Sequence, residues 1–269
     1  MMLLDPFFVC IASILALAVL GLPIGLSMIA GSILYLFMSG LDMGIAAEQL
    51  LNRMYSNYII LAVPLFILAA EFMNTGSLSD RLLAWCNAVV GRFRGGLAQV
   101  NVLQSMVFAG MSGSAIADAA GTGKMIYSLM TRDGKYPASF AAALTASSAV
   151  IGPIIPPSIP MVLYALVSDA SIGYLFLAGI IPGAIMGVSL AIIVYIKART
   201  NDFPVEDPVP LRELPRITWT SLPALMMPVV LLFCIYSGIT TPTEAAAVAA
   251  AYALVISIVL YRSISLKSL

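Results

Sequence analysis

The sequence contains no histidine, and only 10% of its 269 residues are charged. The missing histidine excludes histidine proton relays, histidine metal ligands, and serine–histidine or cysteine–histidine catalysis. The 13 basic residues are balanced by 13 acidic ones, so no excess positive charge favours a nucleic acid as partner. A soluble domain is about 25% charged. The shortage of charge therefore argues against water as the main solvent of this chain.

Cysteine is also scarce. Cys10, Cys86 and Cys234 lie far apart in apolar segments, without a pairing or metal-binding motif. Such cysteines behave as small buried hydrophobic side chains. The sequence likewise has no evident pair of carboxylates, metal-ligand cluster or nucleophile–base pair. It therefore gives no support to an enzyme activity.

Apolar residues make up 61% of the chain, and the mean hydropathy is +1.02. One water-excluded core needs far fewer, so the composition predicts an all-α polytopic membrane protein. The N-terminus carries Asp5 and no basic segment, so its first apolar run is interpreted as a retained span rather than a signal peptide. The predicted membrane segments are 7–38 (two helices broken at GLPIG), 58–74, 137–166, 172–196, 218–238 and 242–261. Residues 77–94 mix charged and apolar side chains and predict an amphipathic interfacial helix.

Two short apolar arms, residues 97–111 and 115–130, follow that helix. Each arm corresponds to roughly 22 Å of helix, too short to cross ~30 Å of hydrocarbon. Charged residues stand on both sides of the pair. We therefore predict a re-entrant hairpin over residues 96–131 that enters the membrane and returns to the same side.

The tip of this hairpin lies in GMSGSAIADAAGTGK, which ends like a phosphate-binding loop. The match fails, because Asp118 occupies the position of the first glycine and Met125 follows the lysine. Ser114 is expected to cap the returning helix, with Asp118 in its first turns. Hydroxyl groups and turn carbonyls at such a tip suit a cation, and an ionisable residue at membrane depth is a candidate functional group. The alternative is that these residues only cap and pack, while Lys124 reaches toward the interface.

The predicted helix 137–166 contains four prolines within IGPIIPPSIP. Proline removes backbone N–H donors and leaves carbonyl groups free. We therefore predict a discontinuous helix that is unwound near this motif, with Ser158 capping the second half. The positive end of that half-helix would face an anion such as a carboxylate. A simple proline kink is the alternative interpretation.

Basic residues predict the orientation of the chain. With the N-terminus outside and the hairpin counted as no crossing, every lysine and arginine except Arg53 and Lys124 falls on the inner side. The plan of 7–38, two helices joined by a short turn, recurs in 218–261 and is entered from the opposite side. This pattern indicates an inverted repeat whose second copy is truncated. The sequence therefore predicts that the chain is incomplete.

Several segments resemble the large membrane subunit of TRAP (tripartite ATP-independent periplasmic) transporters. They are GMSGSAIADAAGTGKM, YPASFAAALTASSAVIGPIIPPSIPMVLYA, LFLAGIIPGAIMG and TPTEAAAVAA. The resemblance implies sodium-coupled import of organic acids, such as a C4-dicarboxylate or sialic acid, by an elevator mechanism in the bacterial inner membrane. It also implies two partners, a small membrane subunit and a periplasmic binding protein.

The resemblance divides the chain into four parts. Scaffold helices and an interfacial arm helix occupy 1–94, and half of a transport domain occupies 95–200. A cytoplasmic linker, 201–217, leads to the first two spans of the second repeat in 218–269. The family's large subunit is longer and holds a second hairpin and a second broken helix.

The resemblance also places a sodium site between the hairpin tip and the unwound segment. The implied site residues at the tip are Ser112, Gly113 and Ser114, and those in the unwound segment are Gly152, Ile155 and Pro156. Asp118 and Ser158 are further candidates. No other cofactor is implied.

Three alternatives remain open at this point. The first is a sodium- or proton-coupled carrier of related hairpin architecture that works without a binding protein. A channel is the second, although no ring of pore-lining charges is evident. The third is an intramembrane hydrolase with Ser112 or Ser114 as nucleophile and Asp118 or Lys124 nearby.

Overall fold

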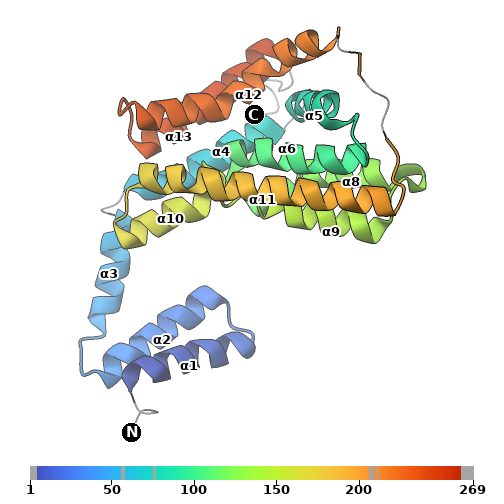
Figure 1. Ribbon diagram of the computed structural model, residues 1–269. Helices are drawn as coiled ribbons and strands as arrows, with labels where there is room; N and C mark the ends of the chain where they lie inside the picture. Colours follow the sequence, from blue (N-terminus) through green and yellow to red (C-terminus); the bar gives the residue numbers. More distant parts are fainter. Residues whose placement is uncertain (1–4, 56–57, 75–76, 206–208, 211, 262–269) are drawn as a thin grey trace. The chain divides into compact units, whose positions relative to one another are not determined.

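The computed structural model describes residues 5–55, 58–74, 77–205, 209–210 and 212–261 (Figure 1). These residues form helices and loops without any strand, which confirms the predicted all-α class. The chain separates into two compact units, Met1–Tyr58 and Ile59–Leu269. Each unit is considered by itself below.

The first unit is a helical hairpin followed by a further helix. Helices α1 (Pro6–Val19) and α2 (Ile24–Met38) pack side by side and are joined at the predicted GLPIG break, and α3 spans Gly44–Tyr55. Asp5 caps α1 by accepting a hydrogen bond from the Phe7 N–H group. With 14 and 15 residues, α1 and α2 are shorter than the roughly 20 residues that cross a bilayer.

The second unit contains all the remaining long helices. A short 3₁₀ turn, Tyr58–Leu61, leads into α4 (Ala62–Asn74), and α5 spans Ser77–Val90. Near the end of the chain, α12 (Leu214–Tyr236) and α13 (Pro242–Val255) form a second hairpin, and α13 continues into a π-helical turn, Ile256–Leu260. The apolar side of the predicted amphipathic helix α5, with Leu78, Leu82 and Cys86, is buried inside the protein, where α5 packs against α6 and α12.

The predicted re-entrant hairpin consists of three helices rather than two. Its first arm is α6 (Gly96–Ser112), and its second arm is divided into α7 (Ala115–Ala120) and α8 (Thr122–Thr131). The division falls at Gly121, whose φ of −89° and ψ of −101° are not helical. The second arm was thus wrongly expected to be continuous over 115–130.

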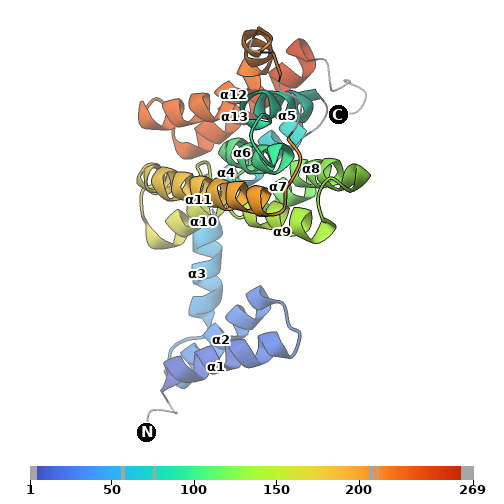
Figure 2. The ribbon, with the colours of Figure 1, turned by 45° about the vertical axis from the view of Figure 1, so that its right-hand side comes forward.

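The predicted discontinuous helix is confirmed. Helix α9 spans Ala138–Ala149 and α10 spans Ile159–Ser168, while residues 150–158 between them are not helical. The next helix, α11 (Ile172–Thr200), runs without a break through Pro182, so the uninterrupted helix predicted over 172–196 is confirmed. Helix α6 contacts α4, α5, α8, α9, α11 and α12 and so lies at the centre of the second unit (Figures 1 and 2).

Three of the described helices are long and apolar enough to cross a membrane: Ile172–Thr200, Leu214–Tyr236 and Pro242–Leu260. A fourth span results if α4 and α5, which are bent by 73° relative to each other, count together. Helix α13 starts with a capping box, in which Thr241 accepts from the Glu244 N–H and Glu244 accepts from the Thr241 N–H. The chain is therefore a multi-pass membrane protein.

Candidate functional site

The hairpin tip is a tight turn made by two residues. Gly113 ends α6 in the left-handed conformation, with φ of +61°, and its N–H group donates to the Ala109 carbonyl. Ser114 then starts α7, and its hydroxyl accepts a hydrogen bond from the Ala117 N–H group at 3.3 Å. The predicted capping role of Ser114 is confirmed. Ser112 is buried, and its hydroxyl accepts from the Ser114 N–H group at 3.4 Å.

The unwound segment between α9 and α10 is held by its own capping serine. The Ser158 hydroxyl caps the N-terminal end of α10 by accepting from the Met161 N–H group. It also donates to the Pro153 carbonyl. Because prolines cannot donate, the segment keeps no regular helical ladder through this motif. Gly152, Pro156, Pro157 and Ser158 are all buried.

The tip and the unwound segment are in direct backbone contact. The Gly113 carbonyl accepts a hydrogen bond from the Ile159 N–H group at 3.3 Å. A Cβ atom on Gly113 would lie 2.3 Å from the Pro157 carbonyl oxygen, and one on Gly152 would lie 3.2 Å from the Ser114 carbonyl carbon. At position 113 only glycine allows such an approach, since real Cβ atoms do not come so close to backbone, and at position 152 the contact is tight. The structure therefore brings together predicted residues from both broken elements.

Ile155 and Pro156 lie in the same segment but have different surroundings. The Ile155 side chain packs on Gly183 of α11, where a Cβ atom on the glycine would lie 2.4 Å from it. The Pro156 carbonyl oxygen lies 3.8 Å from the position of a Cβ atom on Gly110, near the end of α6. Both residues can offer an ion only backbone carbonyl oxygens.

Asp118 lies one helical turn beyond the tip rather than in this contact. Its side chain is 1% exposed, and the Thr122 hydroxyl donates to its Oδ1 atom at 2.7 Å. Its Oδ2 atom has no hydrogen-bond partner among the described residues. The predicted position of Asp118 in the first turns of the returning arm is confirmed, but the carboxyl group belongs to the junction of α7 and α8.

Sequence reasoning missed a buried polar network between α6 and α9. The Asn101 amide donates to the Thr145 hydroxyl at 2.8 Å, and the Ser148 hydroxyl donates to the Asn101 carbonyl oxygen at 2.9 Å. Ser105 donates to Ser148 at 3.1 Å, and all four side chains are buried. The helical spacing of these residues could have predicted the network, because positions 101 and 105 lie on one face of a helix, and so do positions 145 and 148.

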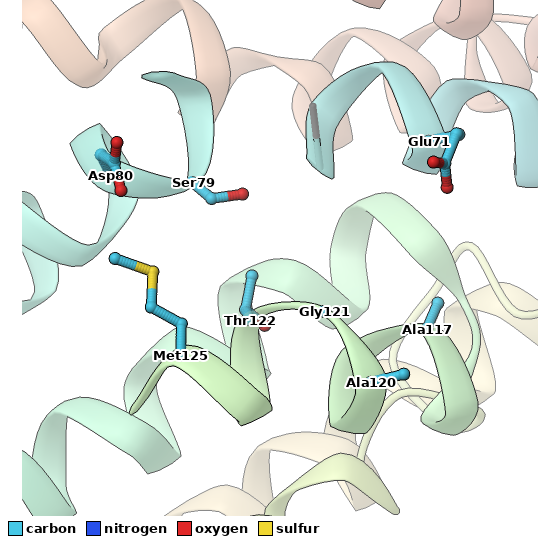
Figure 3. A pocket seen from close by; sticks show the side chains of 8 residues that line it. All are labelled: Glu71, Ser79, Asp80, Ala117, Ala120, Gly121, Thr122 and Met125. Carbon is cyan, nitrogen blue, oxygen red and sulfur yellow. The ribbon is translucent and has the colours of Figure 1, made fainter. Parts of the chain in front are cut away.

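A polar cavity of about 450 Å³ opens beside the junction of α7 and α8 (Figure 3). Two acidic side chains, Glu71 and Asp80, lie across it from Thr122 and Gly121. The other lining residues are Ser79, Ala117, Ala120 and Met125. Lys124 is exposed and lines a different cavity, together with Tyr127 and Ala146.

The described residues contain no group of three or more cysteine, aspartate or glutamate side chains that could hold a metal. At the contact between the tip and the unwound segment, the serine hydroxyl groups and the backbone carbonyl groups are the oxygens that could bind an ion. Ser112 and Ser114 both accept hydrogen bonds from backbone N–H groups of the turn. Neither forms a hydrogen bond with a general base among the described residues, so the hydrolase alternative lacks a nucleophile–base pair.

Residues 11–269 match the family described as "Tripartite ATP-independent periplasmic transporter, DctM component". The chain belongs to this family. The match includes the hairpin, the unwound segment and both flanking helix pairs, so the resemblance identified from the sequence motifs is confirmed.

Curated relatives support the same assignment. The chain is 39% identical over 254 residues to the sialic acid TRAP transporter large permease protein SiaM of Vibrio cholerae, covering 94% of this chain and 59% of that protein. It is 43% identical over 211 residues to the C4-dicarboxylate TRAP transporter large permease protein DctM of Pseudomonas aeruginosa, covering 78% and 49%. It is 39% identical over 251 residues to the 2,3-diketo-L-gulonate TRAP transporter large permease protein YiaN of Escherichia coli, covering 93% and 59%.

The chain thus spans about half to three fifths of the length of these relatives. The three relatives are named for three different organic acids and are all named as permease proteins, not as enzymes. The chain therefore belongs to the DctM family, whereas the names of the relatives do not agree on one substrate.

Proposed function

We propose that this chain is part of the large membrane subunit of a TRAP transporter that imports organic acids in symport with sodium. The observation that carries the proposal is the backbone contact between Gly113 and the Pro157–Ile159 segment. Two interrupted helices meeting inside a membrane protein form the arrangement in which secondary transporters bind ions and substrates.

The helix ends that meet at this contact carry opposite partial charges. The C-terminal end of α6 and the freed carbonyls of the unwound segment present oxygens, which suit Na⁺. The N-terminal end of α10, capped by Ser158, presents a positive pole, which suits the carboxylate of a substrate. The proposed sodium ligands come from Ser112, Gly113, Ser114, Gly152, Ile155 and Pro156.

The names of the relatives support the proposed substrate class, and membership of the family supports the proposed partners. Their names give a sialic acid, a C4-dicarboxylate and a diketogulonate, so a small organic acid is the proposed cargo. The proposed partners are a small membrane subunit and a periplasmic binding protein that delivers the acid. The proposed location is the bacterial inner membrane, with the N-terminus in the periplasm and the hairpin moving as part of an elevator.

The test is uptake of candidate acids into liposomes that contain the complete permease, with its small subunit and binding protein. We expect uptake to require an inward sodium gradient. Ser112→Ala should lower sodium-dependent uptake about tenfold, the effect of losing roughly 1.4 kcal/mol of ion binding. The matched control is Ser189→Ala, because Ser189 is exposed on α11 and bonds only locally to the Met186 carbonyl. Equal uptake with and without sodium would refute the coupling.

A further inference from the structure

A second cavity lies away from the hairpin, where α5 packs against the pair formed by α12 and α13. Its volume is about 300 Å³. Its wall includes Arg81 of α5, Trp219 and Pro223 of α12, and Leu260 and Tyr261 at the end of the π-helical turn. The described residues that line it include no acidic side chain. The wall is therefore mostly apolar and carries one cationic group.

We propose that this cavity binds the head group of an anionic phospholipid, with the lipid phosphate on the Arg81 guanidinium group. The Arg81 side chain forms no hydrogen bond or ion pair within the part of the chain that the structure describes. The neighbouring Asp80 lines a different cavity. A half-buried cation that lacks a protein partner is best satisfied by an anion from outside the chain.

The guanidinium group of Arg81 is held in place before any ligand binds. Its carbon atom lies 4.3 Å from the centroid of the Tyr261 ring. The Tyr261 hydroxyl group donates to the Thr220 carbonyl at 2.7 Å, which fixes the ring on α12. The Ser221 hydroxyl group donates to the Arg81 carbonyl at 3.0 Å, which fixes the backbone of α5. Stacking on a ring leaves the N–H groups at the guanidinium edge free for the paired oxygens of a phosphate.

The cavity lies where two candidate membrane spans have their ends. The spans are Leu214–Tyr236 and Pro242–Leu260, and the hydrogen bond from Tyr261 to Thr220 shows that the start of one adjoins the end of the other. Trp219, which is 76% exposed, stands at the same end. Tryptophan and tyrosine are enriched where spans reach the lipid head groups. The orientation predicted from the basic residues puts this end on the inner side, where anionic lipids attract basic groups.

The wall favours an anionic lipid over two related ligands. A zwitterionic head group also carries an ammonium group, and the described lining offers it no carboxylate. A free phosphate ion makes no use of the apolar wall, whereas the chains of a lipid can lie along Leu260, which is 56% exposed. Arg216 is exposed one turn before Trp219 on α12 and adds a second positive charge on the same helical face.

The test is lipid titration of the complete permease, with its small subunit, in detergent, followed by native mass spectrometry. The probes are phosphatidylglycerol, phosphatidylcholine and inorganic phosphate. We expect one phosphatidylglycerol molecule to bind more tightly than phosphatidylcholine and to resist displacement by inorganic phosphate. Arg81→Gln should weaken this lipid by about tenfold, the effect of losing hydrogen bonds to a charged group. Arg81→Lys should weaken it less, because lysine keeps the charge but loses the planar fork.

The matched control for charge is Arg199→Gln. Arg199 is exposed in the last turn of α11 and also lies over a tyrosine, with its guanidinium carbon 5.6 Å from the centroid of the Tyr195 ring. This variant should keep the affinity of the tight lipid unchanged. Trp219→Leu alters an exposed side chain and should weaken the same lipid several-fold, with unchanged elution volume and helical circular dichroism. It therefore separates ligand loss from misfolding.

Three results would overturn the proposal. The first is equal binding of phosphatidylglycerol by Arg81→Gln and Arg199→Gln. The second is displacement of the lipid by inorganic phosphate, or equally tight phosphatidylcholine, since the cavity would then not select an anionic lipid. The third is loss of binding in Arg81→Gln together with altered circular dichroism and normal binding in Trp219→Leu, which would assign Arg81 a structural role. None of these measurements involves uptake or sodium, so they are independent of the proposed transport function.

Discussion

Helices α6 and α11 lie against each other in the second unit, but they differ in which side chains they bury and which they expose (Figures 1 and 2). Helix α6 has 17 residues, nearly all buried, and carries the buried polar side chains of Asn101, Gln104 and Ser105. Helix α11 has 29 residues, and many of its large apolar side chains are exposed, such as Ile181 by 69% and Ile192 by 54%. The shorter, more polar helix is therefore the interior one.

In a soluble protein the exposed helix is the more polar one, so the reverse arrangement here reflects a hydrocarbon solvent. Hydrocarbon accepts exposed isoleucines at no cost but cannot satisfy polar groups, so these must face the protein interior. The middle of the buried face of α11, between Phe176 and Val194, consists of glycines instead. Gly179, Gly183 and Gly187 recur every four residues and receive the Ile154 carbonyl, the Ile155 side chain and the Met106 side chain. Glycines of this kind let backbones approach where no hydrophobic effect drives helices together.

The largest effect is expected where α6 ends. Gly113→Ala places a methyl group 2.3 Å from the Pro157 carbonyl oxygen and forces a non-glycine residue into positive φ. Together these should destabilise the complete permease by roughly 3 kcal/mol. Reversible unfolding in mixed detergents measures this value. The control is Gly134→Ala, because Gly134 also has a positive φ but has open space around it. This variant measures the cost of the backbone conformation alone. Equal losses of stability in both variants would contradict close contact at the tip.

The next effect concerns the polar interior of α6. Asn101→Leu leaves the hydroxyls of Thr145 and Ser148 without their Asn101 partner and should cost about 2 kcal/mol. The same unfolding experiment tests it. The control is Asn201→Leu, because Asn201 is exposed and bonds only to residues of its own helix end. If both substitutions cost the same, the network does not stabilise the fold.

A smaller effect is expected on the glycine face of α11. Gly179→Ala brings a methyl group 2.3 Å from the Ile154 carbonyl oxygen and should cost about 1.5 kcal/mol after the gain in helix propensity. Gly173→Ala on the same helix meets its first neighbour only at 3.8 Å. It should be neutral or stabilise by up to about 1 kcal/mol. The thermal midpoint in detergent should therefore fall in Gly179→Ala and stay the same or rise in Gly173→Ala.

The smallest effect is expected on the exposed face of α11. Ile192→Val removes one methylene group from a side chain that is more than half exposed, and it should change stability by less than about 0.5 kcal/mol. A loss above 1 kcal/mol in the same assay would show that this face packs on protein in the complete permease rather than on lipid.

Much of this architecture could be predicted from local signals. The GLPIG break, the capping serines 114 and 158, the Thr241–Glu244 capping box and the unwound proline segment each depend on residues within a few positions of one another. Proline and glycine act through their own backbone, and caps act on the next turn, so sequence alone identifies them. The break at Gly121 was missed because a single glycine within an apolar helix is usually tolerated.

The sequence by itself determined the solvent, the helical class, the family and the two places where helices are interrupted, because composition and local chemistry decide each of these. Only the tertiary structure decided that Gly113 meets Pro157, that Ser105 and Ser148 form one network, and that Asp118 is buried without a neutralising partner. These facts join residues about 40 positions apart or concern the surroundings of a side chain. Packing sets them, and a linear pattern does not record packing.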